Sequence, residues 1–172
     1  MWVNIENSVA AMAVAWLVGA TEEELRQGVS SFAGVFRRFN IHLNTPQITY
    51  IDDYAHHPNE IKALYESIKI MYPQYKIKCI FQSHTYSRTI KFKKEFKSVL
   101  KLFDDVYLLD VFSSERELEN KKLLNKVNRY FRGFKRYHEN VLNNIDKEQY
   151  EVWVFLGAGR CNEILKRFKK EH

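Results

Sequence analysis

Two short stretches of the chain gather side chains that can bind anions or transfer protons. The first is Asp52-Asp53-Tyr54-Ala55-His56-His57, which places two carboxylates, a phenol and two imidazoles directly after an apolar run. Pro58 follows at once, and proline is tolerated in the first turn of a helix because its missing N–H would be unpaired there. The stretch therefore lies on a predicted strand-to-helix connection, where open α/β sheets bind their ligands.

The two carboxylates of this stretch have separate tasks. Neighbouring side chains of a strand point to opposite faces, so Asp52 and Asp53 do not form one acid–base pair while the strand continues. We expect one of them to cap the following turn and the other to accept a hydrogen bond from a ribose hydroxyl or to hold a cation. A capping role for both is the alternative.

The two histidines invite a metal interpretation, which the sequence does not support. His56 and His57 are adjacent, so their side chains diverge, and no cysteine or third histidine stands at ligand spacing. We predict no metal site. Contact with phosphate or with a nucleotide base is the preferred interpretation of these imidazoles.

The second stretch, Gln82-Ser83-His84-Thr85-Tyr86-Ser87-Arg88-Thr89, also follows an apolar run and leads into a predicted helix. Arg88 stands near that helix N-terminus, where an anion is favoured. Its guanidinium can hold a carboxylate or a phosphate with two parallel hydrogen bonds. The alternative is an ordinary surface arginine beside capping residues.

A pair of arginines, Arg37-Arg38, stands between two phenylalanines, which would fix the backbone while one arginine projects. That arginine would contact phosphate or form a surface salt bridge. The turn Gly157-Ala158-Gly159 is weak evidence for a nucleotide, because Asn162 takes the place of the third glycine of a dinucleotide-binding turn. No G-x-x-x-x-G-K-[ST] phosphate loop occurs, so another domain would have to hold most of any triphosphate.

Apolar periodicity predicts the elements that position these residues. Strands are expected near 41–43 and at 48–53, 77–82, 106–111, 134–137 and 151–156. Helices are expected at 58–72, 88–103, 121–132, 138–145 and from the last glycine-rich turn to about 168. This alternation predicts an α/β fold with a doubly wound, mostly parallel sheet. Right-handed crossovers would then gather 52–57, 82–88, 110–115 and 157–160 at one edge.

The amino-terminal residues do not follow this alternation. An apolar helix over 5–18 ends at Gly19, and Thr21-Glu22-Glu23-Glu24 forms a capping box that opens a second helix to about Phe32. We expect residues 1–44 to be the helical tail of a preceding domain plus a linker, and residues 45–172 to be the α/β domain.

Composition bounds the class of protein. With 45% hydrophobic and 28% charged residues, the chain is typical of a globular domain. Its net charge of +6 is spread over several predicted helix faces without a stacking platform, so we expect solvated surface rather than nucleic-acid binding. The two cysteines are expected to be reduced packing residues. The longest apolar run is too short to span a bilayer, so we expect a cytoplasmic protein without membrane contact.

Four motifs stand in order along the chain: Asn4–Ala11, Gly34–Phe39, Asp52–Pro58 and Phe81–Thr89. Together they resemble the C-terminal part of the Mur ligases of peptidoglycan synthesis, and the last motif points to the alanine-adding member of that family. The resemblance implies a three-domain enzyme in which ATP, with Mg²⁺, phosphorylates the carboxylate of UDP-N-acetylmuramate, and L-alanine attacks the acyl phosphate. It also implies that 45–172 is a Rossmann-like domain that closes on the N-terminal and central domains.

The resemblance assigns roles by motif position. Arg38, Asp53 and His56 would contact ATP. His84 and Arg88 would face the reacting end, with Arg88 on the carboxylate of alanine. ATP and Mg²⁺ would be held mainly by the central domain, so this segment would contain no complete catalytic site and would be inactive alone.

Two features of the sequence depart from this pattern or offer an alternative to it. Ser83 and Thr85 replace a proline and an arginine that are usual in the family, which leaves amino-acid selection open.

The alternative to a ligase domain is a receiver-like phosphoacceptor domain, because an acidic pair follows one predicted strand and Asp110 lies at the end of another. That alternative lacks a convincing Lys–Ser/Thr pair at the later strand ends.

Overall fold

The chain forms two compact units, Met1–Val35 and Phe36–His172, each of which is described by itself. The computed structural model describes residues 2–113, 117, 120–144 and 150–170. Residues 36–44, which the sequence grouped with the helical lead-in, lie in the second unit because they contain an edge strand of its sheet. That residues 1–33 close a preceding domain stays a prediction.

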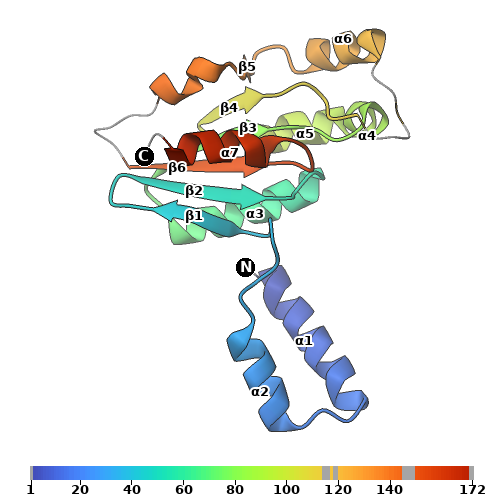
Figure 1. The fold of residues 1–172 in the computed structure, drawn as a ribbon. Helices are drawn as coiled ribbons and strands as arrows, with labels where there is room; N and C mark the ends of the chain where they lie inside the picture. Colours follow the sequence, from blue (N-terminus) through green and yellow to red (C-terminus); the bar gives the residue numbers. More distant parts are fainter. Residues whose placement is uncertain (1, 114–116, 118–119, 145–149, 171–172) are drawn as a thin grey trace. The chain divides into compact units, whose positions relative to one another are not determined.

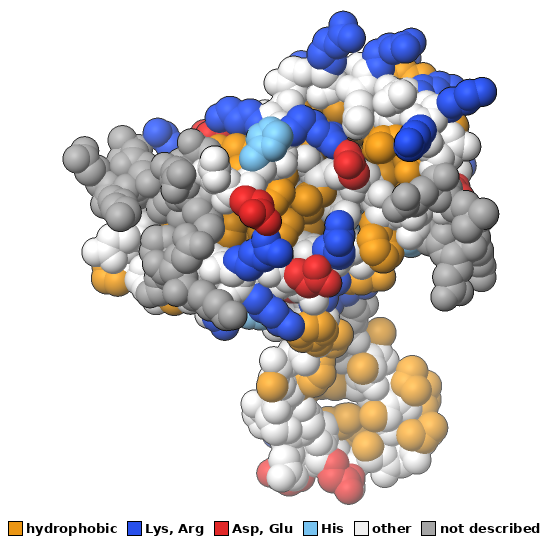
Figure 2. Space-filling view, turned by 45° about the horizontal axis from the view of Figure 1, so that its top comes forward, with side chains coloured by type: hydrophobic (Ala, Val, Ile, Leu, Met, Phe, Trp, Pro, Cys, Tyr) orange, Lys and Arg blue, Asp and Glu red, His pale blue; other side chains and the backbone are white. Residues whose placement is uncertain are grey.

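The first unit is a pair of helices, α1 (Trp2–Leu17) and α2 (Glu22–Ser31). The predicted capping box is confirmed: the Thr21 hydroxyl accepts the Glu24 N–H, and the Glu24 carboxylate accepts the Thr21 N–H at 2.8 Å. Many apolar side chains of this unit are exposed, as Figure 2 shows. Within the described part of the chain, no helix is both long and apolar enough to cross a bilayer.

The second unit is built on one six-stranded sheet with the order β1-β2-β6-β3-β4-β5 (Figure 1). Its strands are β1 (Asn40–Asn44), β2 (Ile48–Asp53), β3 (Lys76–Phe81), β4 (Asp105–Leu108), β5 (Lys135–Arg136) and β6 (Glu151–Leu156). Only β1, at one edge, runs antiparallel to its neighbour, and the other pairs are parallel. The predicted α/β fold with a mostly parallel sheet is confirmed.

Helices cover both faces of this sheet, with α7 on one face and α3 and α5 on the other (Figure 1). The helical elements are α3 (Pro58–Met71), α4 (Tyr86–Lys91), α5 (Lys93–Leu100), α6 (Lys121–Tyr130), the 3₁₀ helix η1 (Glu139–Asn144) and α7 (Cys161–Lys170). The expected single helix 88–103 is therefore divided at Phe92, and the expected helix 138–145 is a 3₁₀ turn.

The core follows from strand alternation. Tyr50 and Ile51 are consecutive and fully buried, and such neighbours face opposite sides of a strand. Tyr50 packs edge-to-face on Phe155 and Phe168, the latter from α7, at centroid distances of 5.9 and 5.8 Å. Because both faces are covered, every residue of β2 and β6 is buried.

Candidate functional site at the carboxyl edge of the sheet

Four parallel strands end at the same level. Asp53 of β2 pairs with Leu156 of β6, which pairs with Phe81 of β3, which in turn pairs with Leu108 of β4. We call these strand ends and the loops that follow them the carboxyl edge. Since β6 lies between β2 and β3, the strand order reverses here, and open α/β sheets bind ligands at such a point. The predicted gathering of the strand-end loops is confirmed for the described residues.

The two aspartates divide their tasks as adjacent strand residues must. Both oxygens of Asp53 accept backbone N–H groups, from Ala55 and from Phe39, each at 2.7 Å. Burial raises the pKa of the Asp53 carboxyl, and these two hydrogen bonds and the nearby Arg38 oppose that rise. Asp53 is therefore the residue that caps the turn.

Asp52 points to the opposite face and holds a cation, which is the guanidinium of Arg37. The Arg37 Nε lies 3.3 Å from Asp52 Oδ2, and His42 Nε2 lies 3.9 Å from the same oxygen. Burial raises the pKa of the Asp52 carboxyl, while Arg37 and then His42 lower it. The sequence motif did not identify this pairing, because the partners are separated by a turn and a strand.

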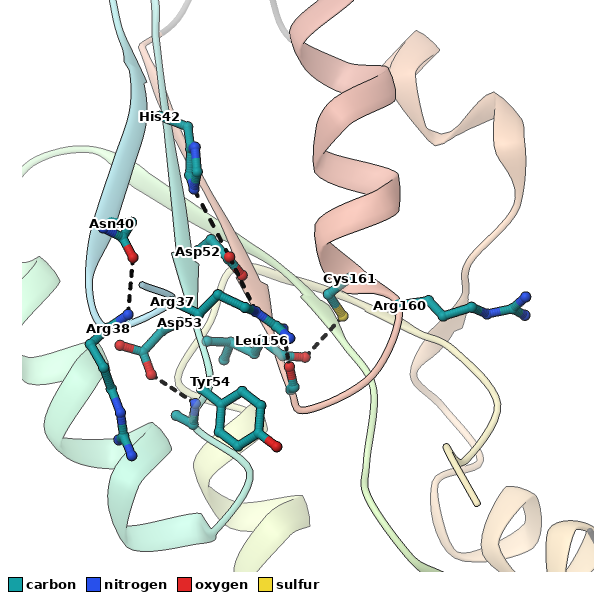
Figure 3. A network of polar contacts seen from close by, with 12 residues as sticks. Arg37, Arg38, Asn40, His42, Asp52, Asp53, Tyr54, Leu156, Arg160 and Cys161 are labelled. Atoms are coloured by element: carbon teal, nitrogen blue, oxygen red, sulfur yellow. Dashed lines mark hydrogen bonds and ion pairs between the residues drawn. The ribbon is translucent and has the colours of Figure 1, made fainter. Parts of the chain in front are cut away.

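The two arginines at the start of the unit point in different directions (Figure 3). Arg37 is buried and donates from Nη2 to the carbonyl of Gly157. Arg38 is exposed, and its backbone N–H donates to Asn40 Oδ1 at 3.1 Å. The sequence expected one arginine of the pair to project, and the projecting one is Arg38.

The imidazoles at this edge have different surroundings. His57 is the N-cap of α3: its side chain accepts the Asn59 N–H while the Glu60 carboxylate accepts the His57 N–H, which makes a capping box.

His56 and His84 lie close together at this edge, with their ring centroids 5.9 Å apart. Burial lowers the pKa of His84, as do Arg88 and His56, against the opposing charge of Glu117. These surroundings disfavour the protonated form of the His84 imidazole.

The side chain of Gln82 joins three strand ends and was not assigned a role from the sequence. Its Nε2 donates to the Asp110 carbonyl at 3.0 Å, and its Oε1 accepts the Arg160 N–H at 2.6 Å. A Cβ added to Gly159 would lie 2.1 Å from that Oε1, and one added to Gly157 would lie 2.2 Å from the Gln82 carbonyl oxygen. The glycine-rich turn thus allows the close approach of Gln82.

The start of α4 carries an anion that belongs to the chain itself. One carboxylate oxygen of Glu117 accepts the Tyr86 N–H at 2.6 Å, and the other accepts the Ser87 N–H at 3.2 Å. Arg88 is half-buried, and its Nη1 has no hydrogen-bond partner among the described residues. The helix N-terminus predicted to take an external anion is therefore occupied by Glu117, whereas one nitrogen of Arg88 has no hydrogen-bond partner in the part of the chain that the structure describes.

The carboxyl edge can therefore bind anions and can accept a proton or a hydrogen bond at a neutral imidazole. His56 and His84 lie on its loops, and Arg88 lies in α4 directly after the second loop. Arg38 lies in the turn before β1, whose next residue, Phe39, donates its N–H to the buried Asp53 at the end of β2. Among the residues that the structure describes, no three His, Cys, Asp or Glu side chains are arranged to hold a metal ion. On the face drawn in Figure 2, Lys and Arg side chains are spread out, with acidic side chains between them.

Comparison with known proteins gives one consistent result. Residues 37–160 match the family model described as the glutamate ligase domain of Mur ligases. The chain is 39% identical to the UDP-N-acetylmuramate–L-alanine ligase of Parabacteroides distasonis over 98% of this chain and 37% of that protein. It is 49% identical to the ligase of the same name from Porphyromonas gingivalis over 67% of this chain and 25% of that protein.

A solved structure agrees with these relatives. The UDP-N-acetylmuramate–alanine ligase of Thermotoga maritima matches with a TM-score of 0.73 and 27% identity, over 98% of this chain and 37% of that one. The chain thus spans little more than a third of the length of the Parabacteroides distasonis and Thermotoga maritima proteins. A receiver-like domain finds no support in these matches, and the Asp110 carboxylate is paired with Arg136.

Proposed function

The chain belongs to the Mur ligase family, and on that premise we propose that it is the C-terminal domain of an ATP-dependent UDP-N-acetylmuramate–L-alanine ligase of peptidoglycan synthesis. The observation that carries the proposal is the match of nearly the whole chain to ligases of that name. The enzyme would be cytoplasmic, and its product would serve the cell wall and therefore cell shape and division.

Arg38 is proposed to contact the phosphates of ATP. Its side chain is exposed at the carboxyl edge, and a guanidinium matches phosphate geometry with two hydrogen bonds. His56, whose Nδ1 lies 2.9 Å from the Tyr54 carbonyl oxygen, would contact the nucleotide. Asp53 is also proposed to contact the nucleotide. Each of its carboxylate oxygens already accepts one backbone N–H, so it would have to accept a second hydrogen bond at one of these oxygens.

Arg88 and His84 are proposed to receive the amino acid. The Nη1 of Arg88 has no hydrogen-bond partner among the residues described here, and it suits a carboxylate because a buried donor left without a hydrogen bond is costly. A neutral His84 beside it can accept a hydrogen bond from an amine, which a protonated imidazole cannot do. Together they would orient L-alanine with its nitrogen toward an acyl phosphate.

ATP, when bound, supplies the phosphoryl group that activates the muramate carboxylate. The residues of this edge suit its anionic groups, but they do not suit Mg²⁺. Asp53 and Asp52 are buried and already engaged, the first by backbone N–H groups and the second by Arg37. We therefore assign Mg²⁺ and most of the triphosphate to the central domain, and UDP-N-acetylmuramate to that domain and the N-terminal one. The segment alone would be inactive.

A chimera tests the proposal. This chain would replace the matching C-terminal segment of the Parabacteroides distasonis ligase, and ADP release would be measured with UDP-N-acetylmuramate and a panel of amino acids. We expect release that requires all substrates and prefers L-alanine, and none from the 172-residue chain alone. A folded chimera that releases no ADP, or turnover by the isolated chain, would contradict the proposal.

Arg88 provides the sharper test of the amino-acid site. Arg88→Lys keeps the charge but removes the two-pronged contact, so we expect the KM for L-alanine to rise by about tenfold or more. The matched control is Arg129→Lys in α6, an exposed arginine whose replacement should leave this KM unchanged.

A further inference from the structure

The turn that carries Arg38 is fixed by its neighbour. Arg37 is 8% exposed, and its guanidinium contacts groups from two strands: the carboxylate of Asp52 at the end of β2 and the carbonyl of Gly157 after β6. The central carbon of this guanidinium, Cζ, lies 5.2 Å from the centre of the Tyr54 ring. One buried cation therefore joins the turn, β2 and the loop after β6.

The backbone on both sides of Arg38 is held in an unusual conformation. Arg37 and Phe39 have φ values of +57° and +53°, in the left-handed region that side chains larger than glycine rarely adopt. The Tyr54 N–H donates to the Arg37 carbonyl at 2.7 Å, and the Phe39 N–H donates to Asp53 at 2.7 Å. These bonds keep the turn in place, with the Arg38 side chain exposed and pointing away from Arg37 (Figure 3).

Arginine suits this anchoring position better than lysine does. The Nε forms an ion pair with Asp52 while Nη2 donates a hydrogen bond to the Gly157 carbonyl, so one planar guanidinium engages two groups at once. A lysine ammonium is a single point charge on a flexible stem and lacks this fixed geometry. Other titratable groups around the pair include His42, with Nε2 3.9 Å from Asp52 Oδ2, the neighbouring carboxyl of Asp53 and the buried thiol of Cys161.

We propose that Arg37 is a positioning residue: by joining Asp52 to the Gly157 carbonyl it holds the turn 37–39, and it thereby presents Arg38 to the anionic ligand of the carboxyl edge. The identity of that ligand as ATP rests on the proposed function, whereas the anchoring of the turn does not.

Amide hydrogen exchange on the 172-residue chain tests the anchoring directly. In Arg37→Met we expect the amides of Phe39 and Tyr54 to exchange about tenfold faster or more, relative to those of Ile51 and Val154 in the sheet. Unchanged protection of both amides in a folded variant would overturn the proposal.

A second variant separates anchoring from general stability. Arg37→Met leaves the Asp52 carboxylate buried without its guanidinium, which by itself destabilises the fold. Arg37→Met/Asp52→Asn removes that charge, so the unfolding midpoint should recover while the amides of Phe39 and Tyr54 stay fast. If protection recovers together with stability, Arg37 is only a structural residue and the proposal is wrong.

Kinetics of the chimera test whether Arg37 acts through Arg38. Arg37→Met should lower kcat/KM for ATP by about tenfold or more, yet cause no further loss in an Arg38→Ala background. If kcat/KM for ATP in the double variant falls by the product of the two single losses, the two arginines act independently and the proposal is wrong. Arg26→Met is the matched control, because this exposed arginine pairs with Glu22 within α2. An inactive chimera would count against the proposed function, and the exchange experiment would still decide the anchoring.

Discussion

Two buried ion pairs lie at opposite edges of the same sheet, and they serve different purposes. At the carboxyl edge, Arg37 Nε lies 3.3 Å from Asp52 Oδ2, with side chains 9% and 1% exposed. At the amino edge, where the parallel strands begin, Lys78 Nζ lies 2.5 Å from Glu151 Oε1, with side chains 8% and 1% exposed. The two pairs are equally buried, so burial alone does not distinguish them.

Their surroundings do distinguish them. Lys78 and Glu151 belong to the neighbouring strands β3 and β6, and Glu151 also accepts the indole N–H of Trp153 at 2.9 Å. Lys78 Nζ lies 5.1 Å from the centre of that indole, on which Tyr107 stacks. Arg37 instead lies in a turn with positive φ. The amino-edge pair strengthens regular structure, whereas the carboxyl-edge pair holds an irregular segment that carries an exposed side chain.

Breaking the amino-edge pair should have the largest effect on stability. Lys78→Met leaves Glu151 buried without its ammonium partner, and such losses cost about 3–5 kcal/mol. Urea unfolding would measure the change, with Lys78→Met/Glu151→Leu expected to recover much of it. The turn 37–39 should keep its amide protection relative to the sheet. A loss of less than about 1 kcal/mol would mean that this pair contributes little.

Gly157→Ala should be the next most damaging change, and it acts at the carboxyl edge. The added Cβ would lie 2.2 Å from the Gln82 carbonyl oxygen, at a φ of +127°. Backbone strain and overlap together should cost about 2–4 kcal/mol. Gly133→Ala is the control, since its φ is +104° but, its chain neighbours aside, no described residue has a heavy atom within 4 Å of the new Cβ. Equal losses in the two variants would contradict the role given to the contact with Gln82.

The pH dependence of stability should show a smaller effect that arises at the carboxyl edge. Burial lowers the folded-state pKa of His84 below its ordinary value of 6.5, so the unfolded chain binds this proton more readily. Stability is therefore retained above pH 6.5 and falls as the pH drops below it. Unfolding midpoints at about pH 7.5 and about pH 5.5 should differ less in His84→Gln than in the parent chain. If the midpoints at the two pH values differ by the same amount in His84→Gln and in the parent chain, His84 is not the source of the pH dependence.

The smallest effect is expected from an exposed ion pair at the amino edge. Lys135 Nζ lies 2.5 Å from Asp105 Oδ1, but these side chains are 57% and 29% exposed. Lys135→Ala should change the free energy of unfolding by less than about 1 kcal/mol, because water and salt screen such pairs. Thermal unfolding at low and high salt would measure it. A loss as large as that of Lys78→Met would show that burial is not what separates the two pairs.

Local rules were sufficient for much of the fold. Strand 48–53 was predicted with the bounds that β2 has, and the helix expected from Pro58 is α3. The separation of Asp52 from Asp53 followed from strand alternation alone. The capping box at Thr21 followed from residue spacing. These features depend on contacts between near neighbours in the chain, which a single sequence records.

Features that depend on distant contacts were not accessible in the same way. The break between α4 and α5 occurs at Phe92 without glycine or proline, and Thr85 precedes α4 with a φ of +64°. Glu117 occupies the N-terminus of α4 from a later loop. The sequence predicted that one of the two adjacent arginines projects, but it did not show which one. Arg37 is the buried arginine because it pairs with Asp52 near the end of β2, a contact between residues far apart in the chain.

The position of β6 has a consequence for how the chain folds. Among the described strands β6 is the last in sequence, yet it pairs with both β2 and β3, so each of these strands lacks one of its two neighbours until β6 has been made. Pairing between segments so far apart along a chain is slow, because a long loop must close first. During synthesis, the open slot between β2 and β3 would be a target for chaperones and for mispairing with other chains.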